Sequence, residues 1–171
     1  MHQPPDAVDH LLAAWRATRP DLDPAALGLV GRVIVLAEHL QRSVEEALAE
    51  HRLTLGQFDI LATLRRHGPK GGLTPTALLR SVVLSSGGMT SRLDKLEASG
   101  LIERQPDPTD RRGVVVSLTA KGRKVIDAAT ATRFREAERS LPPLSGDQRE
   151  QLTDLLRRWL LRLTPQPERG E

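Results

Sequence analysis

The chain contains no cysteine. This absence excludes disulfide bonds, thiolate metal ligands, cysteine nucleophiles and thiol-based oxidation sensing, and it fits an intracellular compartment. The sequence also lacks any apolar run near the ~18 residues of a membrane helix. Its first residues, 1–6, lack the basic-then-apolar pattern of a secretory signal. We therefore expect a cytoplasmic protein with no membrane partner.

Aromatic residues make up only 2% of the chain, and tyrosine is absent. Proteins that bind single-stranded nucleic acid stack bases on aromatic side chains, so a surface of that kind is not favoured. The formal net charge of +3 and the sequence pI of about 9.9 permit a phosphate-bearing partner, but they also suit many unrelated soluble proteins. Composition therefore favours duplex over single-stranded nucleic acid without identifying either.

Signatures of catalysis and of cofactor binding are equally scarce. The sequence has no glycine-rich phosphate-binding loop and no His-x-x-x-His pair, and its five histidines, at positions 2, 10, 39, 51 and 67, are scattered. Gly87 and Gly88 follow a serine pair, but they precede a periodic helix without the lysine of a phosphate loop. We expect no enzyme activity, no catalytic residues, no metal and no cofactor.

What the sequence does contain is a series of helix start and stop signals. The apolar spacing around Trp15 predicts a short amphipathic helix over residues 7–18. Asp23 then acts as a cap with Pro24 at the first helical position, and this predicts a long amphipathic helix to about Glu50.

The middle of the chain carries two further helix starts. Thr54 and Gln57 form a capping box ahead of an apolar face, and we expect that helix to end at Gly68-Pro69. Thr74 supplies an N-cap with proline at the next position, which predicts a short helix to about residue 81. Together with the segment that follows, these helices predict a helix-turn-helix.

The most informative segment covers residues 84–113. Ser85 offers an N-cap hydroxyl, apolar residues then recur at helical spacing, and Gly100 supplies the positive φ that ends a helix. Two short extended runs, 101–105 and 114–118, follow on either side of a turn-rich tip. A helix with small polar side chains beside an arginine-tipped hairpin suits duplex DNA.

Helices also close the chain. Thr119 caps a predicted helix to about Arg139, and a capping box at Ser145 and Gln148 opens a last helix with leucines at i, i+3, i+4 and i+7. The apolar faces at the two ends exceed the needs of a small DNA-binding core. We therefore expect a homodimer, with packing inside one subunit as the alternative.

We divide this one compact structural unit into three regions. The first carries the extra N-terminal helix and the first dimerisation helix, the second a DNA-binding winged helix-turn-helix, and the third the C-terminal dimerisation helices. Their bounds are residues 1–52, 53–118 and 119–171. The expected fold class is mostly α with a small β-hairpin wing.

The order of these elements closely resembles the MarR family. The motifs that carry the resemblance lie at residues 73–79, 89–97, 100–104, 107–113 and 116–122. The match spans roughly residues 30–130 by motif, and the flanking helices match by pattern only. It implies a winged helix-turn-helix homodimer that usually represses transcription until a small ligand releases it. Two recognition helices about 34 Å apart would match a pseudo-palindromic site in double-stranded DNA.

Side chains suited to DNA gather in the recognition helix and the wing. Short hydroxyls near the start of the helix can reach base edges or phosphates, a lysine further on adds a phosphate contact, and a wing arginine suits the minor groove. The expected DNA-binding residues are Ser85, Ser86, Thr90, Ser91, Lys95, Arg111 and Arg112. The alternatives are that Ser85 is only an N-cap and that Arg111 is a solvated turn residue.

Arg92 departs from the family pattern, which more often has an apolar residue at this position. Its spacing from Met89 and Leu96 turns it toward the core, where a charge needs a carboxylate or an anionic ligand. Asp59 is the candidate partner. An anion that competes with Asp59 for Arg92 would change how the recognition helix is held.

This arrangement is similar to the urate-responsive, PecS-like branch of the family. In that branch a tryptophan from an extra N-terminal helix, an aspartate and two arginines shape the ligand pocket, and the matching residues are Trp15, Asp59, Arg92 and Arg104. The resemblance implies an anionic effector such as urate or a xanthine-like purine, held by two guanidiniums. Trp15 as ordinary core, a static Arg92–Asp59 pair and Arg104 as a phosphate contact are the alternatives.

Two other functions stay open at this point. The effector could be a phenolic or other aromatic acid bound between the dimerisation and DNA-binding regions, with Trp15 only structural. In a different class of function, the winged motif could contact another protein, because the apolar end helices would equally permit a helical interaction dimer that binds no DNA.

Overall fold

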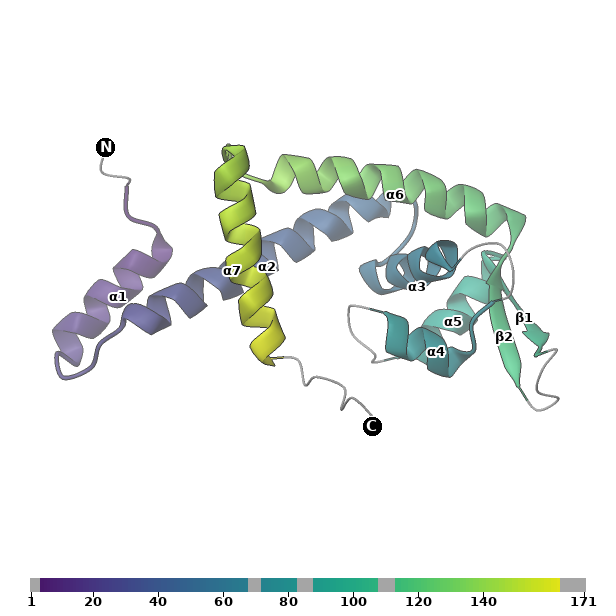
Figure 1. Ribbon diagram of the computed structural model, residues 1–171, viewed down its shortest axis with the longest axis horizontal. Helices are drawn as coiled ribbons and strands as arrows, with labels where there is room; N and C mark the ends of the chain where they lie inside the picture. Colours follow the sequence, from purple (N-terminus) through teal and green to yellow (C-terminus); the bar gives the residue numbers. More distant parts are fainter. Residues whose placement is uncertain (1–3, 68–71, 83–87, 108–112, 164–171) are drawn as a thin grey trace. The chain divides into compact units, whose positions relative to one another are not determined.

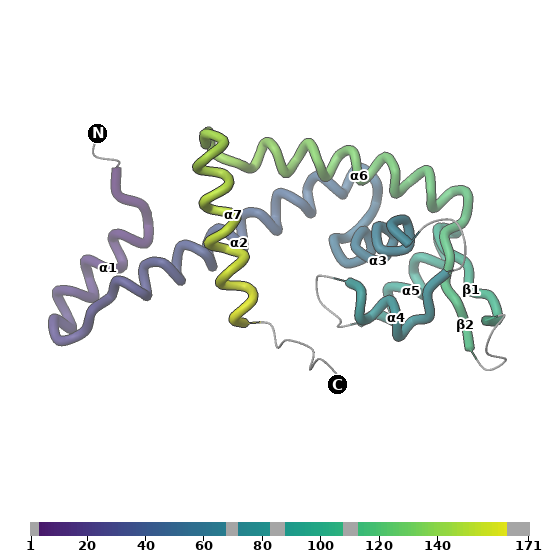
Figure 2. The backbone as a smooth tube through the Cα atoms, viewed as in Figure 1, coloured from purple at the N-terminus to yellow at the C-terminus, as the bar shows by residue number. Residues whose placement is uncertain are grey.

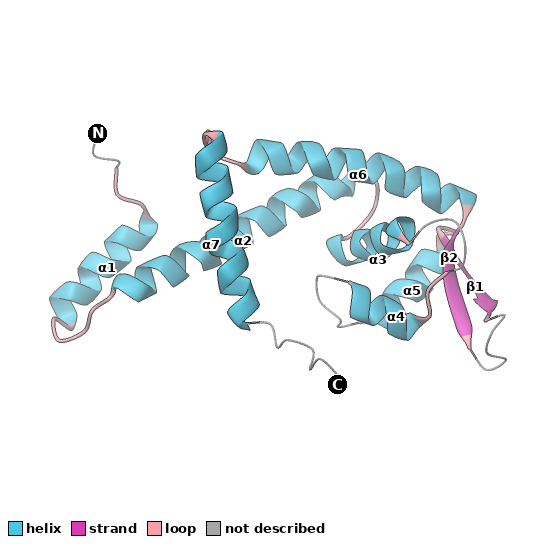
Figure 3. Cartoon of the chain, viewed as in Figure 1, coloured by secondary structure: helices cyan, strands magenta, loops and turns pink. Residues whose placement is uncertain are grey.

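The computed structural model describes residues 4–67, 72–82, 88–107 and 113–163 (Figure 1). The elements in chain order are α1 (Ala7–Thr18), α2 (Ala25–Ala49), α3 (Leu55–Arg66), α4 (Pro75–Ser81), α5 (Met89–Ala98), β1 (Ile102–Pro106), β2 (Val114–Leu118), α6 (Ala120–Ser140) and α7 (Gly146–Leu163). The expected class, mostly α with one small β-hairpin, is confirmed (Figure 3). In the described ranges, every helix is too short or too polar to cross a bilayer.

Local hydrogen bonds explain most helix starts. The Thr54 hydroxyl accepts from the Gln57 backbone N–H while the Gln57 side chain accepts from Thr54 N–H, so the predicted capping box is confirmed. Thr74 caps α4 with Pro75 in the first turn, also as predicted. The capping box of α1, formed by Asp6 and Asp9, was not predicted, although its residues have the required spacing.

Two predicted helix starts differ from the structure. The N-cap of α5 is Gly88, which has a left-handed φ of 73° and makes no side-chain cap bond, so the prediction of Ser85 as N-cap is wrong. A glycine adopts this conformation without the Cβ penalty, and α5 therefore begins later than a hydroxyl cap would place it. At α2 the N-cap is Pro24, and the Asp23 carboxylate instead accepts from Ala25 N–H at 3.0 Å.

The hydrophobic core surrounds α3. Six consecutive residues of this helix, from Asp59 to Leu64, are buried, and they pack with side chains from the end of α2, from α4 and α5, and from the hairpin. Leu48, Leu61, Leu78, Leu96 and Val116 are fully enclosed. This core fixes the orientation of the two helices of the helix-turn-helix.

The hairpin is tied to the core at its base. Its antiparallel register pairs Ile102 with Leu118 and Pro106 with Val114. Leu73, ahead of α4, forms an isolated antiparallel bridge with Val116, with backbone bonds of 2.9 Å in both directions. A Cβ on Gly72 would collide with the Val116 carbonyl oxygen, so only glycine permits this close approach.

Helix α1 folds back onto α2 (Figure 2). Val8 and Leu12 are buried at two glycines of α2, since a Cβ on Gly28 would lie 2.7 Å from a Leu12 methyl and one on Gly31 3.5 Å from a Val8 methyl. Arg32 then joins the two helices through ion pairs to Asp6 at 2.8 Å and Asp9 at 2.6 Å.

The chain divides into two compact units, Met1–Ala137 and Glu138–Glu171. In the second unit, the predicted capping box of Ser145 and Gln148 opens α7. None of the α7 residues is buried, and its exposed apolar side chains are Leu152, Leu155, Leu156, Leu160, Leu161 and Leu163.

Candidate nucleic-acid interface

The exposed face of α5 carries the small polar side chains that the sequence assigned to DNA. Leu93 and Leu96 are buried, whereas Thr90, Ser91 and Lys95 are exposed. These three residues remain predicted DNA contacts. The other predicted contacts, Ser85, Ser86, Arg111 and Arg112, lie outside the described residues.

The base of the wing is fixed to the end of α5. Gly100 has a φ of 67°, which ends the helix as predicted, and the Thr119 hydroxyl donates to the Gly100 carbonyl at 2.7 Å. Lys121 Nζ donates to the Ser99 carbonyl at 2.8 Å, so a cation lies at the negative end of the helix dipole. Gly122 lies so close to the Leu101 carbonyl that a Cβ there would collide with it. Recognition helix, wing and α6 therefore meet at one rigid junction.

Arg104 binds carboxylates of α5. Its Nη2 lies 2.7 Å from Asp94 Oδ1 and its Nη1 lies 2.7 Å from Glu97 Oε2. The hydrogen bond to Asp94 and the two negative charges raise the pKa of Arg104 above its already high ordinary value. The structure thus places Arg104 between strand β1 and the recognition helix.

Arg92 lies on the other side of α5, against the start of α3. A Cβ on Gly56 would lie 2.7 Å from both Arg92 Cζ and Nε, so the guanidinium occupies space that only a glycine leaves open. Arg92 and Lys95 line a cavity of about 480 Å³ with Gln41, Glu45 and Gln57. Asp59 is buried one turn after Gly56 on the same face of α3, as i and i+3 residues are.

The structure separates the remaining predicted effector residues. At 100° per residue, Asp94 points about 160° and Glu97 about 140° around α5 from Arg92, so Arg104 lies on the opposite side of the helix from the Arg92 cavity. Trp15 is 45% exposed on α1, beside the first half of α2, whereas Asp59 follows the far end of α2. Those 25 helical residues span about 37 Å. One subunit therefore brings Asp59 and Arg92 to one region, without Trp15 or Arg104.

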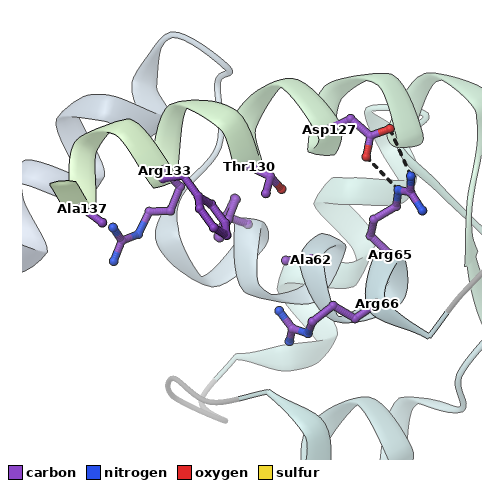
Figure 4. A pocket seen from close by; sticks show the side chains of 9 residues that line it. Ala62, Arg65, Arg66, Asp127, Thr130, Arg133 and Ala137 are labelled. Carbon is purple, nitrogen blue, oxygen red and sulfur yellow. Dashed lines mark hydrogen bonds and ion pairs between the residues drawn. The ribbon is translucent and has the colours of Figure 1, made fainter. Parts of the chain in front are cut away.

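A second cavity, which the sequence did not indicate, lies between α3 and α6 (Figure 4). It has a volume of about 520 Å³ and includes Phe58, Ala62, Arg66, Arg133 and Phe134 in its lining. At one end, Arg65 Nε donates to Asp127 Oδ1 at 2.7 Å, as the dashed lines in Figure 4 show. The combination of apolar walls and guanidiniums suits an aromatic anion. The lining residues come from distant parts of the chain, so no local sequence pattern predicts the cavity.

Known proteins share this arrangement. A model of the MarR family matches residues 53–114. The HTH-type transcriptional regulator PecS of Dickeya dadantii is 31% identical over 151 residues, which cover 88% of this chain and 91% of that protein. A crystal structure of an E. coli MarR mutant complexed with operator DNA matches with a TM-score of 0.67 and 26% identity, covering 85% of this chain and 97% of that one.

A third relative shows likeness of fold alone. Bordetella bronchiseptica BpsR, described by a mechanism in which 6-hydroxynicotinic acid regulates its DNA binding, matches with a TM-score of 0.67 at 22% identity, over 76% of this chain and 91% of that one. The sequence match to PecS extends over nearly the whole of both chains, and the match to the family model runs from the residues before α3 to the start of β2. The chain belongs to the MarR family, whose members are DNA-binding transcription regulators rather than enzymes.

Proposed function

We propose that this regulator is a homodimeric repressor that binds a pseudo-palindromic operator and is released by a small planar anion. The observation that carries the dimer is the uncovered apolar surface of the end helices. All the large apolar side chains of α7 that are exposed in one chain are leucines, and α2 adds Leu29, Ile34 and Leu36, which are 56–61% exposed. A second copy would cover them, because exposed apolar stripes on long helices mark interfaces.

The Arg92 cavity is the proposed effector site. Its charged lining is the guanidinium of Arg92, the ammonium of Lys95 and one carboxylate, Glu45, which accepts from Gln41 at 3.2 Å. Two cations against one carboxylate favour an anion, and Asp59 lies on the same face of α3 as an acceptor for a ring N–H. Urate or a xanthine-like purine has this set of groups. Occupation of the cavity would move Arg92, which connects α5 to α3, and so change the presentation of the recognition helix.

Trp15 enters this proposal through the dimer. Helix α1 packs on the first half of α2, which is about 37 Å long, whereas α3 follows its other end, so we expect a pocket that uses both Trp15 and Asp59 to combine two subunits. The tryptophan of one copy would then line the cavity of the other. Arg104, by contrast, is engaged by α5 and has no place in the cavity as the structure shows it.

Fluorescence anisotropy of a labelled duplex from the promoter beside the gene tests the proposal. We expect saturable binding by the wild-type protein that is released by urate or xanthine. Arg92→Met and Asp59→Asn should retain DNA binding and lose the release. Gly56→Ala keeps every charged group but places a methyl 2.7 Å from Arg92 Cζ, and it should weaken the response in the same way. Tight DNA binding that neither purine alters would remove the effector assignment and keep the repressor.

A second effector class is favoured by the cavity between α3 and α6. Three arginines line this apolar cavity, which fits a phenolic or other aromatic acid. Arg65 is paired with Asp127 and Arg133 with Glu136. The variants Arg66→Met and Arg133→Met provide the matched comparison, since each removes a guanidinium without touching the Arg92 cavity. If salicylate or a hydroxycinnamate releases the duplex and only these variants resist it, the effector is an aromatic acid.

A further inference from the structure

The recognition helix carries acidic side chains where a DNA-binding helix gains nothing from them. Asp94 lies between Ser91 and Lys95 on the exposed face of α5, and its side chain is 57% exposed. Glu97 follows one turn later, with 39% of its side chain exposed. DNA phosphates repel carboxylates, so two such groups on this helix oppose the approach of a duplex.

The positive and negative charges of α5 lie on different sides of the helix. Its sequence contains two basic residues, Arg92 and Lys95, and two acidic ones. Arg92 packs against Gly56 of α3, on the other side of the helix. Lys95 lines the same cavity as Arg92, so the two cations lie on one side of α5, and the side that carries Asp94 and Glu97 has no basic residue of the helix itself.

Arg104 supplies the missing charge from strand β1. The register pairs Arg104 with Val116, and alternation along the strand places it on the same face as the buried Ile102, toward α5. Its two terminal nitrogens each reach a different carboxylate at 2.7 Å, and its side chain is 28% exposed. A guanidinium is suited to this because its fork donates in two directions at once.

We propose that Arg104 is a positioning residue for DNA binding, which neutralises Asp94 and Glu97 and fixes strand β1 to the recognition helix. The two ion pairs compensate the carboxylates on that side of α5. They also set the angle between the helix and the wing, which must enter neighbouring grooves together.

This role differs from a structural ion pair in what its loss would change. Partly exposed ion pairs contribute little to folding, so the stability of the protein should hardly depend on Arg104. Its affinity for DNA should depend on Arg104 strongly. The effect should disappear when the two carboxylates are removed as well, because then nothing is left to neutralise.

A comparison of single and triple variants by fluorescence anisotropy tests the inference on the full-length protein and the promoter duplex. Arg104→Gln should weaken binding about tenfold or more. The triple variant Arg104→Gln, Asp94→Asn, Glu97→Gln should return to within about threefold of wild type, and Arg104→Lys should be intermediate. Thermal melting of each variant by circular dichroism confirms that the proteins compared are folded.

The alternative is that Arg104 itself binds a phosphate. In that case the triple variant would bind as weakly as Arg104→Gln, and the dependence of affinity on salt would be shallower by about one counterion in both. That result overturns the inference, as does an Arg104→Gln variant that binds like wild type. If the wild-type protein does not bind DNA, both the proposed function and this inference fail. If it binds DNA and only the comparison of the Arg104 variants gives the opposite result, the proposed function stands and this inference alone fails.

Discussion

The winged-helix core buries its apolar side chains, whereas the C-terminal helix α7 exposes them. Helix α3 buries six consecutive residues, and Leu78, Leu93 and Leu96 of the helix-turn-helix are at most 2% exposed. Helix α7 has six leucines, five of which lie on one stripe, and buries none of them. The winged-helix part thus buries its apolar side chains within one chain, whereas α7 leaves its leucines exposed, as the proposed dimer interface requires.

This contrast implies that folding and assembly are separable in this protein. A change in the core of the winged helix should unfold a chain whatever its oligomeric state. A change on the stripe of α7 should leave a folded chain that no longer assembles.

The largest expected effect comes from opening the core. Leu96→Ala removes a side chain with no exposed surface, and substitutions of this kind lower the free energy of unfolding by about 2–5 kcal/mol. Urea denaturation followed by circular dichroism measures the loss. Leu79→Ala, in the same helix-turn-helix at a position that is 42% exposed, is the matched control and should change the unfolding little.

The next effect concerns assembly. Leu156→Asp together with Leu160→Asp places two charges on the apolar stripe of α7, so we expect a folded monomer. Its DNA affinity should fall about 100-fold, because a monomer contacts one half-site and loses the avidity of two linked DNA-binding regions.

Light scattering after size exclusion gives the mass of the variant, and anisotropy gives its affinity. Gln151→Asp adds one charge to an exposed position of the same helix and should leave both unchanged. A variant that remains dimeric would show that α7 is not the interface.

A smaller effect is expected at the junction of wing and α6. Gly122→Ala pushes a methyl against the Leu101 carbonyl, and such overpacking costs about 1–3 kcal/mol. Gly146→Ala at the start of α7 is the opposite case, because no atom lies within 4 Å of the added Cβ. It should be neutral or slightly stabilising, since alanine favours a helix over glycine. Thermal melting of the pair measures the difference, and equal melting temperatures would contradict the close approach.

The smallest effect is expected where α1 meets α2. The backbone hydrogen bond from Asp6 and the hydrogen bond from Arg32 lower the pKa of Asp9 below its ordinary 3.8. A carboxylate with a lowered pKa in the folded state stabilises that state above its unfolded pKa, and the contribution is lost as the pH falls through the folded value. We therefore expect α1 to loosen below about pH 4.

Trp15 fluorescence in a Trp159→Phe background reports this change. Arg32→Met should shift the same signal at neutral pH, because it removes both ion pairs that hold α1. If acid and Arg32→Met leave the emission of Trp15 unaltered, the ion pairs do not fix the helix.

The sequence predicted those features whose causes are local. Thr54 with Gln57, Thr74 with Pro75 and Ser145 with Gln148 act within one turn, and each starts a helix as expected. The start of α5 was mispredicted because a left-handed glycine, Gly88, took the place of a hydroxyl cap.

The site was predictable only in part, because its contacts are set by tertiary structure. The inward turn of Arg92 follows from helical spacing, and the structure confirms that it faces α3. The partners of Arg104 depend on the strand register, and the distance between Trp15 and Asp59 depends on the uninterrupted length of α2. No spacing rule connects Phe58 and Arg66 with Arg133, so the cavity between α3 and α6 could not be predicted from the sequence.

The contact between Gly56 and Arg92 also bears on how this regulator diverged from others in its family. A Cβ at position 56 would lie 2.7 Å from the guanidinium, so an alanine there would displace the flexible end of Arg92. Among homologous chains the two positions should covary, with a long cation at 92 inherited together with glycine at 56. A lineage that acquired alanine there first would hold its arginine in another position, and the wall of this cavity would change with it.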